Sequence, residues 1–130
     1  MNSWSFGTDN DYLIKLVLQG KKTATTSLYG VDKLPTIGEE SMICFDNEKD
    51  ACIVKTKSYK VMKFNEMTED LAKLEGEGDL SLDYWKKTHY DYFKSIDPSF
   101  NEDSLIIFEE FFLIKTLFEE KEETIKKYVL

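Results

Sequence analysis

The strongest constraint on the fold comes from two apolar-rich segments, residues 41–45 and 51–62, that flank a short polar loop. Both have the length and residue types of β-strands, and the loop 46–50 suits a hairpin, so they are predicted to pair antiparallel. A further apolar run at 105–118 predicts one or two more strands. Because a chain of 130 residues forms one hydrophobic core, all of these strands are expected in one domain.

Helical and turn signals precede the hairpin. Residues 9–19 carry apolar side chains at helical spacing, and Gly20 can end this helix in the left-handed conformation. The Thr-rich run 22–28 predicts a strand, and the Gly and Pro residues of 29–38 predict turns. The helix has three candidate N-caps: Thr8, Asp9 and Asn10.

Two more helices are predicted between the hairpin and the last strands. The first begins after Asn65 or Thr68 and ends at Leu74, and the second runs over 81–94 with Ser81 as its N-cap. The face of the second helix carries Leu82, Trp85, His89 and Phe93. This order of elements predicts an α+β fold whose short, mostly antiparallel strands can close into a small barrel.

The charge of the chain limits its ligands. The formal net charge is −8, and all 17 basic residues are Lys. An acidic chain opposes tight, non-specific binding to long nucleic acid, whereas a small or single-nucleotide ligand is compatible with it.

The N-terminal residues lack the regions of a signal peptide and no stretch is long enough to span a membrane, so we expect a cytoplasmic protein without a membrane partner. Cys44 and Cys52 lack metal-binding spacing and are expected to be free thiols.

The stretch "GKKTATTS", residues 20–27, has two interpretations. In the simpler one, Gly20 ends a helix, the lysines complement the helix dipole and the threonines begin a strand. In the functional one, the side chains of Lys22 and Thr25 face the same cavity. Residues three apart point to opposite faces of a regular strand, so a shared site requires irregular backbone between them.

A second candidate feature is "EGEGD", residues 75–79, with three carboxylates separated by glycines. It is either a flexible acidic loop or a place where crowding shifts a carboxyl pKa toward neutrality. The single His89 fits a packing role or a site role, and without His or Cys partners a zinc site is not expected. Aromatic side chains that could stack on a base are Trp4, Phe6, Tyr84, Trp85 and Tyr90, most of them expected in the core.

These segments, in this order, resemble the ASCH-domain family, and more narrowly its branch first described as the domain of unknown function DUF984. The resemblance runs over about residues 4–116. Besides "GKKTATTS" and "EGEGD", it rests on Trp4-Ser5-Phe6-Gly7, Pro35 with Gly38, Phe64-Asn65-Glu66, and Ser81-Leu82 with Trp85 and His89. It implies a small β-barrel related to the PUA fold, a class associated with RNA, with flanking helices. Residues 1–118 would form this domain, and residues 119–130 a tail or short helix of the same unit.

The motif residues also imply an activity. The general ASCH pattern Gly-x-Lys-x-x-Glu-x-Arg matches at Gly20 and Lys22, but Thr25 replaces the Glu and Ser27 the Arg. The stretch is more similar to the Gly-x-Lys-Thr-x-Thr of small ASCH-like amidohydrolases that remove the acetyl group of N4-acetylcytidine with a Lys, a Thr and a Glu. The resemblance implies a metal-independent hydrolase without a cofactor, a nucleoside-like substrate, and the catalytic residues Lys22, Thr25 and Glu75. The expected substrate-binding residues are Lys21, Thr23, Glu77, Trp85 and His89.

Two assignments of the catalytic roles stay open. In one, Thr25 is the nucleophile, Lys22 is its base or proton shuttle, and Glu75 orients Lys22 or protonates the leaving amine. In the other, Glu75 is the base and Lys22 donates to the oxyanion. Glu77 is the alternative to Glu75.

Two other functions compete with hydrolysis. An RNA-binding module or ribonuclease of the ASCH type would need a basic groove despite the acidic total. Its candidate lysines are Lys15, Lys21, Lys22, Lys55 and Lys57. A regulatory domain that binds a nucleotide-like ligand without turnover is the third possibility.

Overall fold

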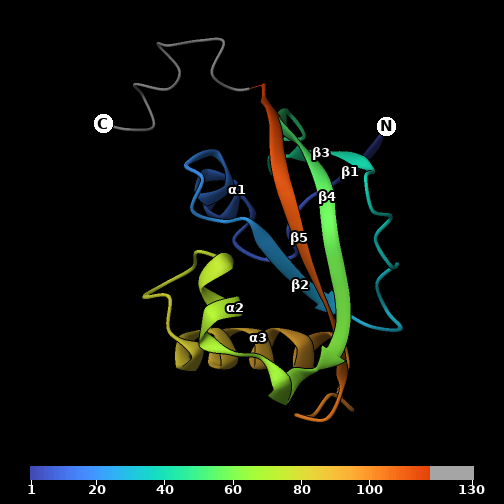
Figure 1. Cartoon of the computed structure of the whole chain (residues 1–130), viewed down its shortest axis with the longest axis vertical. Helices are drawn as coiled ribbons and strands as arrows, with labels where there is room; N and C mark the ends of the chain where they lie inside the picture. The colour runs from blue at the N-terminus through green and yellow to red at the C-terminus, as the bar shows by residue number, and fades with distance from the viewer. Residues whose placement is uncertain (118–130) are drawn as a thin grey trace.

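One five-stranded sheet forms the frame of the protein (Figure 1). The computed structural model describes residues 1–117. The strands are β1 (Asn2–Trp4), β2 (Ala24–Leu28), β3 (Glu40–Cys44), β4 (Asp50–Lys63) and β5 (Leu105–Thr116). Their order in the sheet is β1-β3-β4-β5-β2, and every neighbouring pair is antiparallel except β1 with β3. The sheet curls into a half-barrel around the two long strands β4 and β5.

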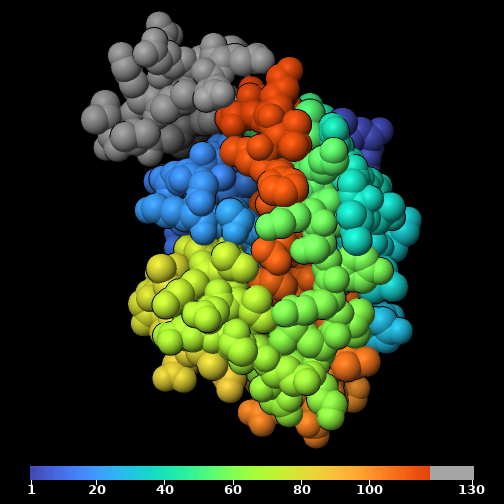
Figure 2. Space-filling view, viewed as in Figure 1, coloured from blue at the N-terminus to red at the C-terminus, as the bar shows by residue number. Residues whose placement is uncertain are grey.

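Three helices pack on this sheet: α1 (Asn10–Leu18), α2 (Glu69–Leu74) and α3 (Leu82–Ile96). A 3-10 turn, Phe64–Glu66, joins β4 to α2. Figure 1 shows α1 beside one half of the long strands and α2 with α3 at the other end. In Figure 2 the α1 and α2 segments lie in continuous contact along one side of β4 and β5.

The predicted N-cap residues are present at the start of α2 and α3, and α1 begins differently. The Thr68 hydroxyl accepts from the Leu71 N–H and the Ser81 hydroxyl from the Tyr84 N–H, so these two N-caps are confirmed. The first helix differs, because its N-cap Asp9 lies in the left-handed region and makes no side-chain capping bond. Its neighbour Asn10 instead accepts from the Phe6 N–H and donates to the Cys44 carbonyl, which ties the start of α1 to β3.

Two apolar clusters hold the helices to the sheet. The first packs α2 and α3 on β2, β4 and β5, and its centre includes Phe64, Trp85, Phe93 and Phe100. The second packs α1 on β3, β4 and β5 around Ile14 and Val54. The strand ends and helix termini between the clusters carry polar side chains, and the candidate site lies there.

The predicted α+β class and the mostly antiparallel sheet are confirmed, and the predicted hairpin is β3 with β4. The run at 105–118 is one strand, β5, and the short strand β1 was not predicted, since three residues carry no periodic signal.

Cys44 and Cys52 are free, and burial raises the pKa of Cys52 to about 11. In the described part of the chain no helix has the length and apolar character needed to cross a membrane. The predicted tail at 119–130 lies outside the described residues.

Phe100 should be the most sensitive of the aromatic positions for stability, since it is fully buried and its ring contacts Phe64, Tyr90 and Phe93. We expect Phe100→Ala to lower the free energy of unfolding by about 3–5 kcal/mol in urea denaturation, because it removes buried area and leaves a cavity. The control is Phe112→Ala on β5, whose side chain is 50% exposed. Equal losses in the two variants would contradict this description of the core.

Candidate active site

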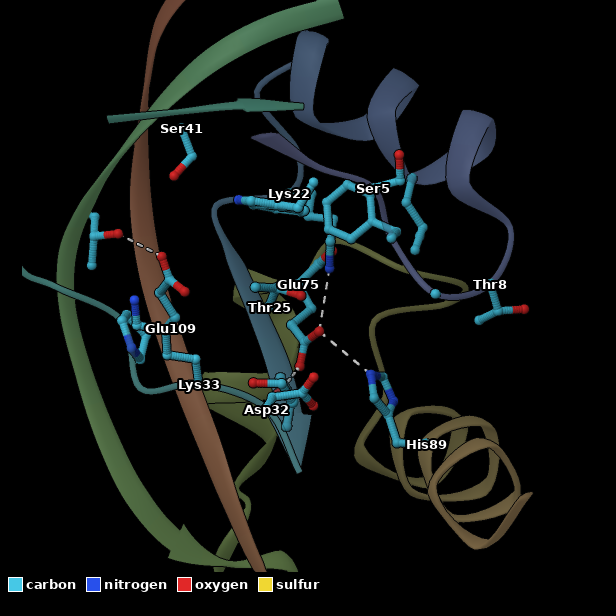
Figure 3. Close-up of a pocket in the computed structure, with 18 of the residues that line it drawn as sticks. Ser5, Thr8, Lys22, Thr25, Asp32, Lys33, Ser41, Glu75, His89 and Glu109 are labelled. Carbon is cyan, nitrogen blue, oxygen red and sulfur yellow. Dashed lines mark hydrogen bonds and ion pairs between the residues drawn. The ribbon is translucent and has the colours of Figure 1, made fainter. Parts of the chain in front are cut away.

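The buried polar side chains of the described residues converge on one place. Six polar or charged residues are buried, and all except Asn10 line a single cavity of about 400 Å³. The five are Lys22, Ser41, Thr56, Glu75 and His89. Burying polar groups is costly unless they are paired, so such a concentration beside a cavity marks this as the candidate functional site (Figure 3).

Irregular backbone after α1 brings Lys22 into the site. The N–H groups of Lys21 and Lys22 both donate to the Leu16 carbonyl, which ends the helix. The Thr23 N–H then donates to the Leu74 carbonyl at the end of α2, and β2 begins at the next residue. Lys22 therefore stands outside the strict alternation of β2, as a site shared with Thr25 requires.

A glycine allows the acidic loop to approach Lys22 closely. Gly76 has a φ of +69°, and a Cβ at this position would lie 2.2 Å from the Lys21 carbonyl oxygen. Glycine alone lacks that atom and adopts this φ without strain. The loop after α2 can thus pass against the backbone of 21–22 and direct Glu75 and Glu77 at the Lys22 side chain.

The Lys22 ammonium is buried between these two carboxylates. Its Nζ lies 2.7 Å from Glu77 Oε2, 3.2 Å from Glu75 Oε1 and 3.5 Å from the Glu75 carbonyl oxygen. The ring centroid of Phe6 lies 5.4 Å from the same nitrogen. Three acceptors face the three N–H bonds, so the geometry fits the charged ammonium, which a buried site tolerates only with such partners.

Glu75 is the centre of the network. Oε2 accepts from the Thr26 hydroxyl at 2.7 Å and from the Trp85 indole N–H, while Oε1 faces Lys22 and lies 3.4 Å from His89 Nε2. Burial by itself raises the pKa of Glu75, but Lys22, then His89 and Thr26, together lower that pKa well below its ordinary value. Glu75 is therefore a carboxylate with both oxygens engaged, which makes it a poor base.

His89 is the second basic side chain of the network. Its Nδ1 lies 2.8 Å from the Trp85 carbonyl oxygen, which can only accept, so Nδ1 carries a proton. Its Nε2 faces the Glu75 carboxylate, which favours a second proton there. Burial lowers the pKa of His89, but Glu75 and Glu77 outweigh burial and the net pKa is raised. The imidazole also stacks on the Trp85 ring, with 4.4 Å between centroids.

Glu75, Glu77 and His89 are the residues of this site that could ligate a metal, because they offer donor atoms within 4.8 Å of one another. The Lys22 ammonium, however, already contacts both carboxylates. A metal ion between these carboxylates would therefore have to displace the ammonium. The donor set therefore fits a metal poorly while Lys22 is in place.

The structure brings most of the expected site residues together. Lys22, Thr25, Glu75, Glu77 and His89 all line the cavity. Lys21 and Thr23, expected to bind substrate, are exposed and do not line it, because they lie on the outer side of the bend before β2. Trp85, also expected to bind substrate, is buried behind Glu75 rather than on the cavity wall.

The threonine that contacts Glu75 is Thr26, and not the predicted nucleophile Thr25. Thr26 donates to Glu75, and alternation along β2 directs the side chain of Thr25 to the other face. There its register partner is Glu109 of β5. Among the described residues no hydrogen bond involves the Thr25 hydroxyl, so this hydroxyl is free to react.

Residues that the sequence analysis did not single out complete the cavity. Glu109 accepts from the Thr56 hydroxyl at 2.7 Å, and Ser41 lies on the same wall (Figure 3). The signal for Glu109 was a pair of glutamates inside an otherwise apolar strand. Of the aromatic candidates, Trp4 and Phe6 line the cavity, whereas Tyr90 packs in the core.

Comparisons with known proteins identify the family. Residues 2–115 match the model of the ASCH domain, so the chain belongs to the ASCH-domain family. The crystal structure of an ASCH domain from Lactobacillus crispatus JV V101 is 28% identical, has a TM-score of 0.82 and covers 88% of this chain and 79% of its own. A protein of the DUF984 family from Enterococcus faecalis V583 is 27% identical, with a TM-score of 0.79 and coverage of 92% and 84%. No curated protein matches the chain. The resemblance to the ASCH family and its DUF984 branch is confirmed.

His89 is the single histidine of the chain, so proton NMR can follow its titration directly. We expect its midpoint to lie above the ordinary value of 6.5. Glu75→Gln should lower the midpoint, because glutamine lacks the negative charge that offsets the effect of burial on the pKa of His89. The charged His89 stabilises the fold below its unfolded pKa, and this contribution is lost as the pH rises through the raised folded pKa.

The matched control for this titration is Glu69→Gln on the exposed start of α2, which should leave the midpoint unchanged. A wild-type midpoint at or below 6.5 would show that Glu75 does not hold His89 as a cation.

Proposed function

We propose that the protein hydrolyses the amide of an N-acylated nucleoside or base, of the N4-acetylcytidine type, in this cavity. The observation that carries the proposal is the buried Lys22 ammonium, which Glu75 holds beside a cavity that Thr25 also lines. Amide hydrolysis needs a nucleophile and a donor for the developing oxyanion. A volume of about 400 Å³ suits a small ligand.

The charges around the cavity favour a neutral ligand. Five carboxylates line the cavity, against two lysines and one histidine: Asp32, Glu39, Glu75, Glu77 and Glu109, against Lys22, Lys33 and His89. A phosphodiester chain would meet more negative than positive groups there, whereas an uncharged acylated nucleoside would not. The rings of Trp4 and Phe6 on the wall provide apolar surface for a base.

The geometry favours Lys22 as the oxyanion donor, which is its role in the second assignment, and Glu75 as the group that orients Lys22, which is its role in the first. Lys22 contacts two carboxylates and so acts as the donor to the oxyanion, not as the base. Its contact with the Glu75 carbonyl is long, 3.5 Å, and that N–H can turn to a substrate oxygen. Glu75 orients Lys22 and is itself held by Thr26 and Trp85.

The reaction then proceeds through an acyl-enzyme. The Thr25 O–H bond breaks as its oxygen bonds to the acyl carbon, and the carbonyl electron pair moves to its oxygen near Lys22. The carbonyl then re-forms as the C–N bond breaks, and the amine takes the proton that Thr25 released. Water attacks the acyl-Thr25 ester, a proton from the water goes to the Thr25 oxygen as the ester bond breaks, and the carboxylic acid is released. Amide and water thus give amine and acid.

Hydrolysis of N4-acetylcytidine, followed by chromatography of cytidine, tests the proposal. We expect turnover by the wild type and losses of at least about 100-fold in Lys22→Met, Thr25→Val and Glu75→Gln, because each removes a group that stabilises or performs the chemical step. The control is Thr116→Val at the end of β5, outside the cavity. Full activity in Thr25→Val would contradict the assignment.

RNA binding, the alternative raised by the sequence, has less support from the geometry. Lys22, one of its five candidate lysines, is buried in ion pairs and not available to phosphate. If wild-type protein binds single-stranded RNA with an affinity that falls steeply with salt and does not hydrolyse the nucleoside, the binding module is the correct function.

A further inference from the structure

Thr25 lacks a base in the network described so far. The Lys22 ammonium has no lone pair, and both ring nitrogens of His89 face acceptors. Glu75 accepts on both oxygens. Glu77 contacts the Lys22 ammonium at 2.7 Å through Oε2, and it lies on the loop after α2 rather than beside Thr25 in the sheet. Proton removal from a threonine hydroxyl needs a group with a free lone pair within reach.

Glu109 is placed to fill this gap. Thr25 and Glu109 are register partners on β2 and β5, so their side chains project from the same face of the sheet with Cβ atoms about 5 Å apart. Both line the cavity (Figure 3). The Thr56 hydroxyl fixes Glu109 Oε2, and among the described residues no hydrogen bond involves Oε1.

The remaining carboxylates of the cavity are less suited to this role. Asp32 is exposed and accepts from the Leu28 N–H at 2.9 Å, so it stabilises the turn after β2. Glu39 is exposed at the cavity wall before β3. The sheet partner of Thr25 is Glu109, and neither Asp32 nor Glu39 pairs with Thr25.

We propose that Glu109 is the general base for Thr25, a role that rests on the proposed amide hydrolysis. The Thr25 O–H bond breaks as its oxygen bonds to the acyl carbon, and the proton passes to Glu109 Oε1. Glu109 gives this proton to the amine as the C–N bond breaks, takes one from the attacking water, and returns it to Thr25 as the ester bond breaks. All protons are thereby balanced, and Lys22 remains an ammonium throughout.

The surroundings of Glu109 suit a carboxyl that both takes and gives a proton. Burial raises the pKa of Glu109, Thr56 lowers it, and Glu39 raises it further, for a net rise. The groups that face it are Glu39 from the segment before β3, Thr56 and the register partner Tyr59 from β4, and Thr25 from β2. A raised pKa brings the group nearer to the pH at which base and acid forms interconvert.

The test compares Glu109→Gln with Glu110→Gln in the hydrolysis of N4-acetylcytidine. Glu110 is the next residue on β5, contacts Ser58 and Lys57 on the other face and does not line the cavity. Because glutamine keeps the shape but cannot take a proton, we expect Glu109→Gln to lower kcat by at least about 100-fold with little change in KM, and Glu110→Gln to retain wild-type rates. Thermal unfolding confirms that each variant is folded.

A pH profile separates a base from a structural residue. The wild-type rate should fall at acid pH as Glu109 is protonated, and Thr56→Val should move this limb to higher pH, since Thr56 lowers the pKa of Glu109. A raised KM at unchanged kcat in Glu109→Gln, or an acid limb unaffected by Thr56→Val, would overturn the proposal while leaving the hydrolase intact. A wild type without turnover would overturn both.

Discussion

The buried ammonium of Lys22 sets a condition that the rest of the site has to satisfy. Lys22 is only 2% exposed, and burying its charge is costly unless anions and other acceptors surround it. The fold meets this requirement with two glutamates from one loop, and that loop reaches Lys22 because Gly76 lets it pass against the backbone of Lys21. The end of α1, the start of β2 and the end of α2 are thereby fixed at one point.

The same ion pairs divide the cavity into two functional ends. At one end, Lys22 and His89 contact Glu75, Lys22 also contacts Glu77, and Trp85 supports Glu75 from outside the cavity. At the other end, Thr56 and Glu109 form a separate hydrogen-bonded pair on the long strands. Thr25 lies between the two ends, because β2 pairs with β5 and begins directly after the Lys22 bend.

Much of this arrangement follows from local sequence rules. The hairpin β3–β4 and the caps Thr68 and Ser81 are signalled by residue type and order. The link between "GKKTATTS" and "EGEGD" was implied by the resemblance to the ASCH family. The contribution of Thr26 was not, because adjacent threonines differ only in the face to which the strand turns them. Lys21 and Thr23 were expected to bind substrate because they belong to the motif, but the bend before β2 leaves both exposed outside the cavity. The glutamate pair of β5 is a sequence signal, but the position of Glu109 opposite Thr25 depends on pairing between strands about 80 residues apart in sequence.

A double-mutant cycle on the free energy of unfolding measures whether Lys22 and Glu75 stabilise one another as a buried pair. Urea denaturation of wild type, Lys22→Met, Glu75→Gln and the double variant gives the coupling energy. Glu75→Gln should cost about 3–5 kcal/mol, because it leaves the buried Lys22 charge with a weaker partner. The double variant should lose about 1–3 kcal/mol less unfolding free energy than the two single variants lose together. Single losses that add to within about 0.5 kcal/mol would contradict it.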